Sequence, residues 1–314
     1  MTVVFVFAWF ATRGEREKQG KKSSSSNRYQ FKTITDRFHT LEEFQQALRD
    51  AGLESSDLIV GVDFTKSNES SGKYSFDGKS LHYISPESLS MMNLIEFPPQ
   101  YTDLYPTADA NAPQTTVLNP YQEVIKILGL TLEKFDEDGL IPAYGFGDLK
   151  TSNHSVFPFK AHAAPCHGFK EVIQRYNEIT PNMKLSGPTS FAPIIRKAIE
   201  TIIANNNQYT ILVIVADGLV TDRQETIDAI VEATNHPLSI LVVGVGDGPF
   251  ELMEEFDDAL PQRRFDNFQF VHFNAVMTRG NENPEVAFAV ACLMEIPDQY
   301  KAIRELGLLN TTSS

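Results

Sequence analysis

Three oxygen-bearing side chains follow one apolar run at alternate positions. Residues 58–62, LIVGV, lead into Asp63, and Thr65 and Ser67 come next in the same short stretch. A continuous apolar run is typical of a buried parallel strand, and the carboxyl ends of such strands are where α/β sheets place their sites. The D-x-T-x-S spacing alone is weak evidence for a functional site, because Asp, Ser and Thr are common in turns.

Two further loops carry side chains of the same kind. SGPTS, residues 186–190, contains Thr189 and precedes a predicted helix, while Asp217 ends the apolar strand predicted over 209–218. Together the loops offer carboxylates and hydroxyls, without Cys or His. Hard cations such as Mg²⁺ prefer these oxygen ligands. We therefore predict a Mg²⁺ or Mn²⁺ site formed by Asp63, Thr65, Ser67, Thr189 and Asp217.

Other chemistry fits these residues less well. A Mg²⁺-dependent phosphatase of the haloacid-dehalogenase type needs a second acid two residues after its nucleophile, and Thr65 stands there. VGVGDG, residues 243–248, lacks the G-x-G-x-x-G spacing of a dinucleotide site, so we interpret Asp247 as a turn or cap residue. Cys166 is adjacent to His167, but adjacency in sequence does not make a catalytic dyad, and we expect a structural thiol.

The elements that must position these loops alternate along the chain. Apolar runs and helical periodicities follow one another, which predicts a doubly wound, mostly parallel α/β sheet with helices on both faces, Rossmann-like in class. A hairpin is predicted over 73–84, around Asp77 and Gly78. The predicted strands are 57–64, 140–148, 209–218, 238–248 and 265–273, and the predicted helices are 39–53, 120–135, 168–179, 191–206, 222–235, 250–260 and 284–306.

The ends of the chain and one internal segment depart from this alternation. Residues 1–33 are predicted to be a disordered or irregular tail, basic between 13 and 32. The proline-containing stretch at about 88–117 has no periodicity and is interpreted as an inserted surface loop. We expect one domain over 34–304, followed by a C-terminal tail over 305–314.

Composition narrows the classes of partner. The formal net charge of −14 argues against a nucleic-acid or anionic-membrane surface, since both require clustered Lys and Arg. The apolar run 3–11 is too short to span a bilayer. Two cysteines without a C-x-x-C pair fit a reducing compartment. We expect a cytoplasmic protein, with the nucleus as the second location.

The motifs together resemble a known family. D-x-T-x-S, the G-x-T-S loop and a strand ending in D-G resemble the metal-ion-dependent adhesion site (MIDAS) of von Willebrand factor A domains. GVDFTKSN, NPYQEVIKILGLTL, LSGPTSFAPII and PLSILVVGVGDGPF resemble the copine A domain, and more specifically that of copine-like RING ubiquitin ligases. The resemblance covers about residues 35–302, although the 88–117 segment is longer than the corresponding connection in the family.

The resemblance implies a function for the predicted site. It assigns the metal to the same five residues and makes the domain an interaction module, in which the ion binds Asp or Glu side chains of other proteins. It also makes a role in protein ubiquitination an alternative. No cysteine follows Cys292, so the metal ligands of a RING are absent from this sequence and we expect no enzyme activity from it alone. A Mg²⁺-dependent phosphatase is the weakest alternative.

Overall fold

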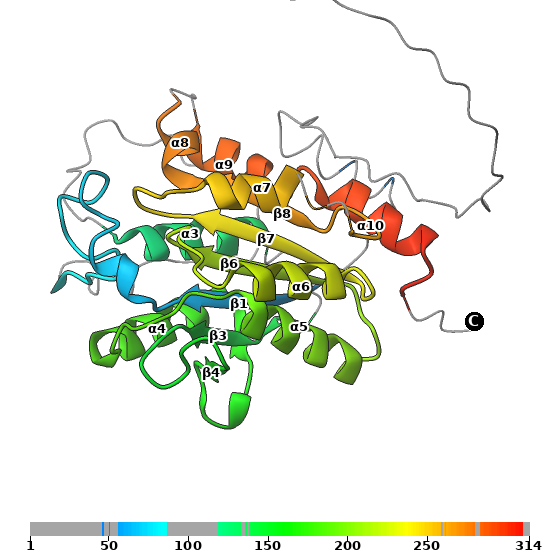
Figure 1. Cartoon of the computed structure of the whole chain (residues 1–314), viewed down its shortest axis with the longest axis horizontal. Coiled ribbons are helices and arrows are strands. Elements are labelled where there is room, and N and C mark those ends of the chain that lie inside the picture. The colour runs from blue at the N-terminus through cyan, green and yellow to red at the C-terminus, as the bar shows by residue number, and fades with distance from the viewer. Residues whose placement is uncertain are drawn as a thin grey trace, which may run out of the picture. The chain divides into compact units, whose positions relative to one another are not determined.

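A six-stranded sheet lies at the centre of the described residues (Figure 1). The computed structural model describes residues 46, 50, 56–86, 118–132, 136, 138–258, 260, 262–279 and 283–309. Neighbouring strands run in the order β4-β3-β1-β6-β7-β8, and every pair is parallel except β3 with β4. The strands are β1 (Asp57–Asp63), β3 (Ala143–Phe146), β4 (Val156–Pro158), β6 (Thr210–Ala216), β7 (Leu238–Gly244) and β8 (Phe268–His272).

Helices cover both faces of this sheet, as predicted. One layer contains α3 (Pro120–Leu132), α4 (Gly168–Ile179), α8 (Phe273–Met277), α9 (Pro284–Leu293) and α10 (Ile296–Glu305). The other contains α5 (Ala192–Ala204), α6 (Arg223–Ala233) and α7 (Glu251–Asp258). The doubly wound α/β class is therefore confirmed.

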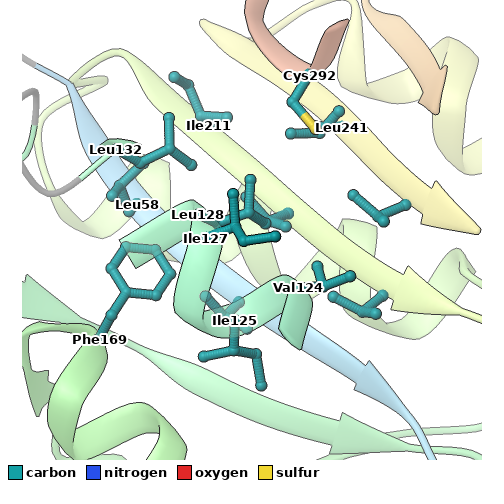
Figure 2. Packing of buried hydrophobic residues seen from close by; sticks show 14 of the residues in the cluster. Leu58, Val124, Ile125, Ile127, Leu128, Leu132, Phe169, Ile211, Leu241 and Cys292 are labelled. Atoms are coloured by element: carbon teal, nitrogen blue, oxygen red, sulfur yellow. The ribbon is translucent and has the colours of Figure 1, made fainter. Parts of the chain in front are cut away.

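Alternation along β1 shows how two cores arise from one continuous apolar run. Leu58 and Val60 belong to the core under α3, α4, α9 and α10, whereas Ile59 belongs to the core under α5 and α6. Successive side chains of a strand point to opposite faces, so a strand covered on both sides must be apolar throughout. Figure 2 shows Leu58 of β1 beside Leu132 of α3, and Leu241 of β7 beside Cys292 of α9, within this one core.

One strand prediction needs correction, and one strand was missed. The strand predicted over 140–148 is interrupted at Pro142, which lacks the backbone donor a strand interior uses. Its first part, β2 (Leu140–Ile141), pairs instead with β5 (Cys166–His167) in a separate two-stranded sheet. Its second part is β3. The edge strand β4 was not predicted, since its three residues are too few to show a period.

The predicted hairpin over 73–84 is wrong. Asp77 and Gly78 do form a turn, with φ of 51° and 71°. The flanking residues fold as successive turns, held by bonds such as Phe76 N–H to the Gly72 carbonyl (3.1 Å) and Leu81 N–H to the Asn68 carbonyl (2.9 Å). The turn at Asp77 and Gly78 was therefore predicted correctly. A hairpin also requires two paired strands, whereas this segment packs Phe76 and Leu81 into the core.

Several predictions concern residues outside the described ones. These are the 1–33 tail, most of the 39–53 helix and the 88–117 insert. At the other end, α10 runs to Glu305, and Leu306, Leu308 and Leu309 pack against the core, so folded residues continue past 304. Within the described residues, no helix has both the length and the apolar character needed to cross a membrane.

Candidate metal centre

Asp63 and Asp217 lie at the carboxyl ends of adjacent strands, as the sequence predicted. β1 and β6 are paired with Val62 opposite Val215; Asp63 is the last residue of β1, and Asp217 directly follows β6. Both aspartates are fully buried. The parallel register therefore brings together two carboxylates that are separated by more than a hundred residues in the sequence.

The loop after β1 arranges its own hydroxyls. The Asp63 Oδ1 atom accepts a hydrogen bond from the Thr65 N–H (2.8 Å), which turns the chain sharply at the strand end. The Thr65 and Ser67 hydroxyl oxygens lie 3.1 Å apart. The 3-10 helix η1 (Lys66–Glu69) then begins, so the carboxylate and both hydroxyls gather within five residues.

The loop carrying Thr189 joins the other two loops. Its neighbour Ser186 accepts a bond from the Lys66 N–H (2.5 Å), which ties it to the first loop. The Thr189 N–H donates to the Thr221 hydroxyl (2.9 Å), and the Thr189 carbonyl accepts from the backbone N–H of Thr221 and Asp222 (3.1 Å each). Thr189 is buried between the loop after β1 and the loop after β6.

The two carboxylates differ in their hydrogen bonding. Asp217 accepts from the Ser71 hydroxyl (2.9 Å) and the Leu219 N–H (3.2 Å), and Ser67 also hydrogen bonds to it. The Asp63 Oδ2 atom is buried and has no hydrogen-bond partner. A buried carboxylate oxygen without a partner is costly, because it has lost water and gained nothing in return.

The pKa values of the two aspartates also favour a bound cation. Burial, and then the nearby Asp217 charge, raise the pKa of Asp63 to about 8. Burial also raises the pKa of Asp217. A divalent cation would offset both the desolvation and the mutual repulsion, since an opposite charge favours the ionised form. The donor set therefore fits a hard cation.

Hydroxyls are essential to any such site. Within the described ranges, no group of three or more His, Cys, Asp or Glu side chains could hold a metal. An ion between Asp63 and Asp217 would thus depend on Thr65, Ser67 and Thr189 for its remaining protein ligands. All five predicted residues belong to the loops that the fold brings to one edge of the sheet, although which of them contact an ion stays a prediction.

Sequence reasoning missed residues that support this site. Ser71 holds Asp217 from the same loop that supplies Ser67, and its single hydroxyl proton is shared between Asp217 and the Ser67 carbonyl, each 2.9 Å from its oxygen. Gly147 has a φ of 80°, and a Cβ there would lie 2.2 Å from the Thr65 methyl carbon. Ser71 could not be singled out within the serine-rich stretch, whereas Gly147, next after β3, had a recognisable strand-end position.

The backbone carbonyl of Asp63 accepts hydrogen bonds from two aromatic side chains. It lies 2.8 Å from His82 Nε2 and accepts a bond from the Tyr121 hydroxyl (3.2 Å). Burial lowers the pKa of His82 to about 4. A neutral ring bonded to a carbonyl through Nε2 must carry its proton there, so Nδ1 accepts from the Tyr176 hydroxyl 2.8 Å away. Helices α3 and α4 thereby fix the end of β1.

The structure also shows the surroundings of Asp247 and Cys166, the two other residues that the sequence analysis interpreted. Asp247 caps the neighbouring loop, accepting from the N–H groups of Tyr74 (2.8 Å) and Ser75 (2.9 Å), which agrees with a turn residue rather than a dinucleotide site. Cys166 is buried, and burial raises the pKa of its thiol to about 11. A thiol that resists ionisation is a poor nucleophile, so a structural role fits better than a catalytic dyad.

A doubly wound sheet whose carboxyl edge collects carboxylates and hydroxyls from three loops defines a domain of the von Willebrand factor A type. The copine family profile matches residues 112–312, and the chain belongs to the copine family. The family expected from the motifs is therefore confirmed, and with it the A-domain class.

Relatives include ubiquitin ligases and copines. E3 ubiquitin-protein ligase RGLG4 of Arabidopsis thaliana is 48% identical over 301 residues, covering 91% of this chain and 68% of the relative. RGLG5 of the same plant is 46% identical, covering 92% and 63%. Copine family protein 2 of Caenorhabditis elegans is 46% identical over 275 residues, covering 87% of this chain and 3% of the relative. The shared sequence is thus only part of each relative.

Solved structures with a similar chain path are more distant. The manganese-loaded Plasmodium vivax TRAP protein has a TM-score of 0.40 and 10% identity, covering 71% of this chain and 70% of that one. A mussel byssus proximal thread matrix protein, solved with a zinc-occupied MIDAS motif, has a TM-score of 0.39 and 13% identity, covering 76% and 46%.

Proposed function

We propose that this domain is a metal-dependent protein-interaction module, which binds acidic side chains of other proteins through Mg²⁺ or Mn²⁺ at the candidate centre. The observation that carries the proposal is the buried, unpartnered Oδ2 of Asp63 beside a second buried carboxylate, Asp217. Such a pair is stabilised by a cation and is costly without one.

The residues present would hold the ion and leave it electrophilic. Asp63 and Asp217 supply two negative charges, and Thr65, Ser67 and Thr189 supply neutral oxygens. The ion would provide a positive charge that attracts a carboxylate from outside. This matters in a chain of net charge −14, where an acidic partner would otherwise be repelled.

The test is a double variant, Asp63→Ala with Thr189→Ala. We expect loss of Mg²⁺ binding in calorimetry and loss of metal-dependent partner capture, while circular dichroism shows an unchanged fold. Asp247→Ala is the matched control, since this aspartate caps a nearby loop without belonging to the predicted ligand set. Partner capture that is equally strong in EDTA would contradict the proposal.

A second candidate function rests on the relatives. The chain is 48% identical to a protein named as an E3 ubiquitin-protein ligase, and the similarity spans 68% of that protein. We propose that the domain can bring substrates to ubiquitination machinery through the same site. Activity of the present chain itself is not part of the proposal.

An in vitro reaction with E1, E2 and ubiquitin distinguishes recruitment from catalysis. We expect no autoubiquitination by the purified chain, but a Mg²⁺-dependent gain in substrate modification when the chain is fused to an active RING. Autoubiquitination by the unfused chain would show that it is itself a ligase. If the fusion shows no gain in substrate modification while metal-dependent binding is intact, the ubiquitination proposal is wrong and the interaction proposal stands.

A further inference from the structure

A cleft opens beside the candidate metal centre. Its volume is about 540 Å³, within the range typical of ligand-binding pockets. The metal-binding function does not use it. Its walls come from the loop after β1, the turns that follow it and the segment after α4, and they consist of Lys66, Glu69, Ser80, His82, Tyr83, Thr180, Met183, Lys184 and Leu185.

The cleft shares its backbone with the metal loops. Lys66 directly follows Thr65, and Leu185 directly precedes Ser186, the residue whose carbonyl accepts the Lys66 N–H. His82 lines the cleft and is bonded to the Asp63 carbonyl at 2.8 Å. The walls of the cleft are therefore continuous in the chain with two of the loops that carry the predicted ligands.

The walls combine an apolar interior with basic groups. Tyr83 is 46% exposed, and Met183 and Leu185 are half-buried. The Lys184 carbonyl accepts a hydrogen bond from the Leu149 N–H (2.9 Å), which fixes the backbone of this wall. The side chain of Lys184 is exposed, whereas Lys66 pairs with Glu69 at 3.0 Å across exposed surface, which is a weak interaction.

The floor of the cleft is rigid. The His82 ring is stacked between Phe64, with centroids 4.6 Å apart, and Tyr121, with centroids 4.2 Å apart. Its two nitrogens are bonded to the Asp63 carbonyl and the Tyr176 hydroxyl. A preformed floor reduces the entropy lost when a side chain enters, which favours selective binding.

We infer that this cleft is a second subsite for the partner, taking a large apolar side chain of an acidic peptide whose carboxylate reaches the metal centre. The inference rests on the proposed function. Lys184 at the wall complements the acidic character of such a peptide, since Lys66 is already paired with Glu69, and the apolar side chains of the cleft take one of the peptide's neighbouring side chains. An anionic membrane fits less well, because the chain carries a net charge of −14 and this surface is concave rather than densely basic.

The probe is a phage-displayed library of nine-residue peptides with a central Asp and random flanks. It is selected on the purified chain in Mg²⁺ and eluted with EDTA. We expect Leu, Met, Phe or Trp to be enriched at one fixed position relative to the Asp. The double variant Tyr83→Ala with Met183→Ala should then bind a selected peptide about tenfold more weakly, with unchanged Mg²⁺ affinity.

Two control variants isolate the cleft. Tyr74→Ala removes an aromatic that is 81% exposed and does not line it, and Lys170→Glu matches Lys184→Glu in charge on the exposed surface of α4. We expect both controls to bind the selected peptide normally. We expect Lys184→Glu to weaken binding, and calorimetry with Mg²⁺ alone to give the same affinity for all variants.

Each contrary outcome has its own meaning. Metal-dependent selection of Asp peptides with no apolar preference would overturn the inference and leave the proposed function standing. No metal-dependent selection at all, with Mg²⁺ bound, would overturn both. Binding to phosphatidylserine vesicles that is lost in Lys184→Glu, without any peptide selection, would reassign the surface to a membrane.

Discussion

The two carboxylates of the candidate centre have different roles. Asp217 is held by Ser71, Ser67 and the Leu219 N–H, so its orientation is set before any ligand arrives. Asp63 uses Oδ1 for the Thr65 N–H and leaves Oδ2 without a partner. The first carboxylate is positioned by the protein, and the second retains an oxygen for an ion.

Ser71 should matter for metal affinity without being a predicted ligand. We expect Ser71→Ala to weaken Mg²⁺ binding about tenfold in calorimetry, because partners that orient a ligand commonly contribute 10–100-fold. Ser70→Ala is the matched control, since its exposed hydroxyl donates only to the Ser67 carbonyl (3.1 Å). Equal effects of the two substitutions would show that Ser71 does not act through Asp217.

At the scale of elements, the turn after β3 supports the loop after β1. Gly147 adopts a φ of 80° and approaches Thr65 so closely that a Cβ would lie 2.2 Å from the threonine methyl carbon. Neither the loop nor the strand end can retreat easily, because Phe64 N–H is bonded to the Phe146 carbonyl (2.8 Å). Two neighbouring strands thus determine the space in which Thr65 sits.

Gly147→Ala should therefore damage both stability and metal binding. Gly139→Ala is the matched control, because Gly139 has a φ of 66° but no atom within 4 Å of its added Cβ. We expect about 1 kcal/mol of destabilisation for Gly139→Ala from backbone strain, and about 2 kcal/mol more for Gly147→Ala from the clash. Urea unfolding measures both, and equal losses would refute the close approach.

Helix α3 contains a carboxylate whose titration should be measurable. Burial raises the pKa of Glu123 to about 7, and the nearby Lys126 opposes that shift. The helix dipole usually stabilises an ionised carboxylate in the first turn, but for Glu123 the cost of desolvation exceeds this stabilisation. Because the folded-state pKa lies above the unfolded one, Glu123 contributes stability at pH 4 that is lost as pH rises toward 7 and above.

Glu123→Gln should remove this pH dependence. We expect the variant to match the parent chain in unfolding free energy near pH 4 and to exceed it at pH 8, as measured by urea unfolding at both values. Glu178→Gln, at an exposed position on α4, controls for the loss of one negative charge. A parent chain that gains as much stability from pH 4 to 8 as the variant would contradict the raised pKa.

At the scale of the whole molecule, ion binding and folding are linked. The candidate ligands come from three loops that are adjacent only in the folded sheet, so the unfolded chain has no equivalent site. A ligand that binds only the folded state stabilises it by about 2.7 kcal/mol at a hundred times its Kd. Mg²⁺ should therefore raise the unfolding temperature of the chain.

Thermal unfolding with increasing Mg²⁺ tests this linkage. We expect a rising midpoint in the parent chain and a constant one in Asp63→Ala, with Ca²⁺ and Mn²⁺ included to compare ions. Because Asp63→Ala also removes a costly buried carboxylate, its midpoint without metal should not fall below that of the parent chain. A midpoint that rises equally in both proteins would place the ion elsewhere.

Local patterns in the sequence determined the α/β class, most element positions and the oxygen chemistry of the candidate centre. Helix α4 was predicted over its whole length, and the runs around Asp63 and Asp217 were read as strands with acidic ends. These features depend on residue type and spacing within about fifteen neighbours, which is the range over which periodicity is informative.

The tertiary structure decided what depends on contacts between distant segments. It broke the 140–148 strand at Pro142 and replaced the 73–84 hairpin with packed turns. It also placed Ser71 beside Asp217, a contact that the serine-rich sequence could not reveal. It also formed the cleft beside the centre from segments about a hundred residues apart. Such features arise from strand register and loop packing, which no local pattern encodes.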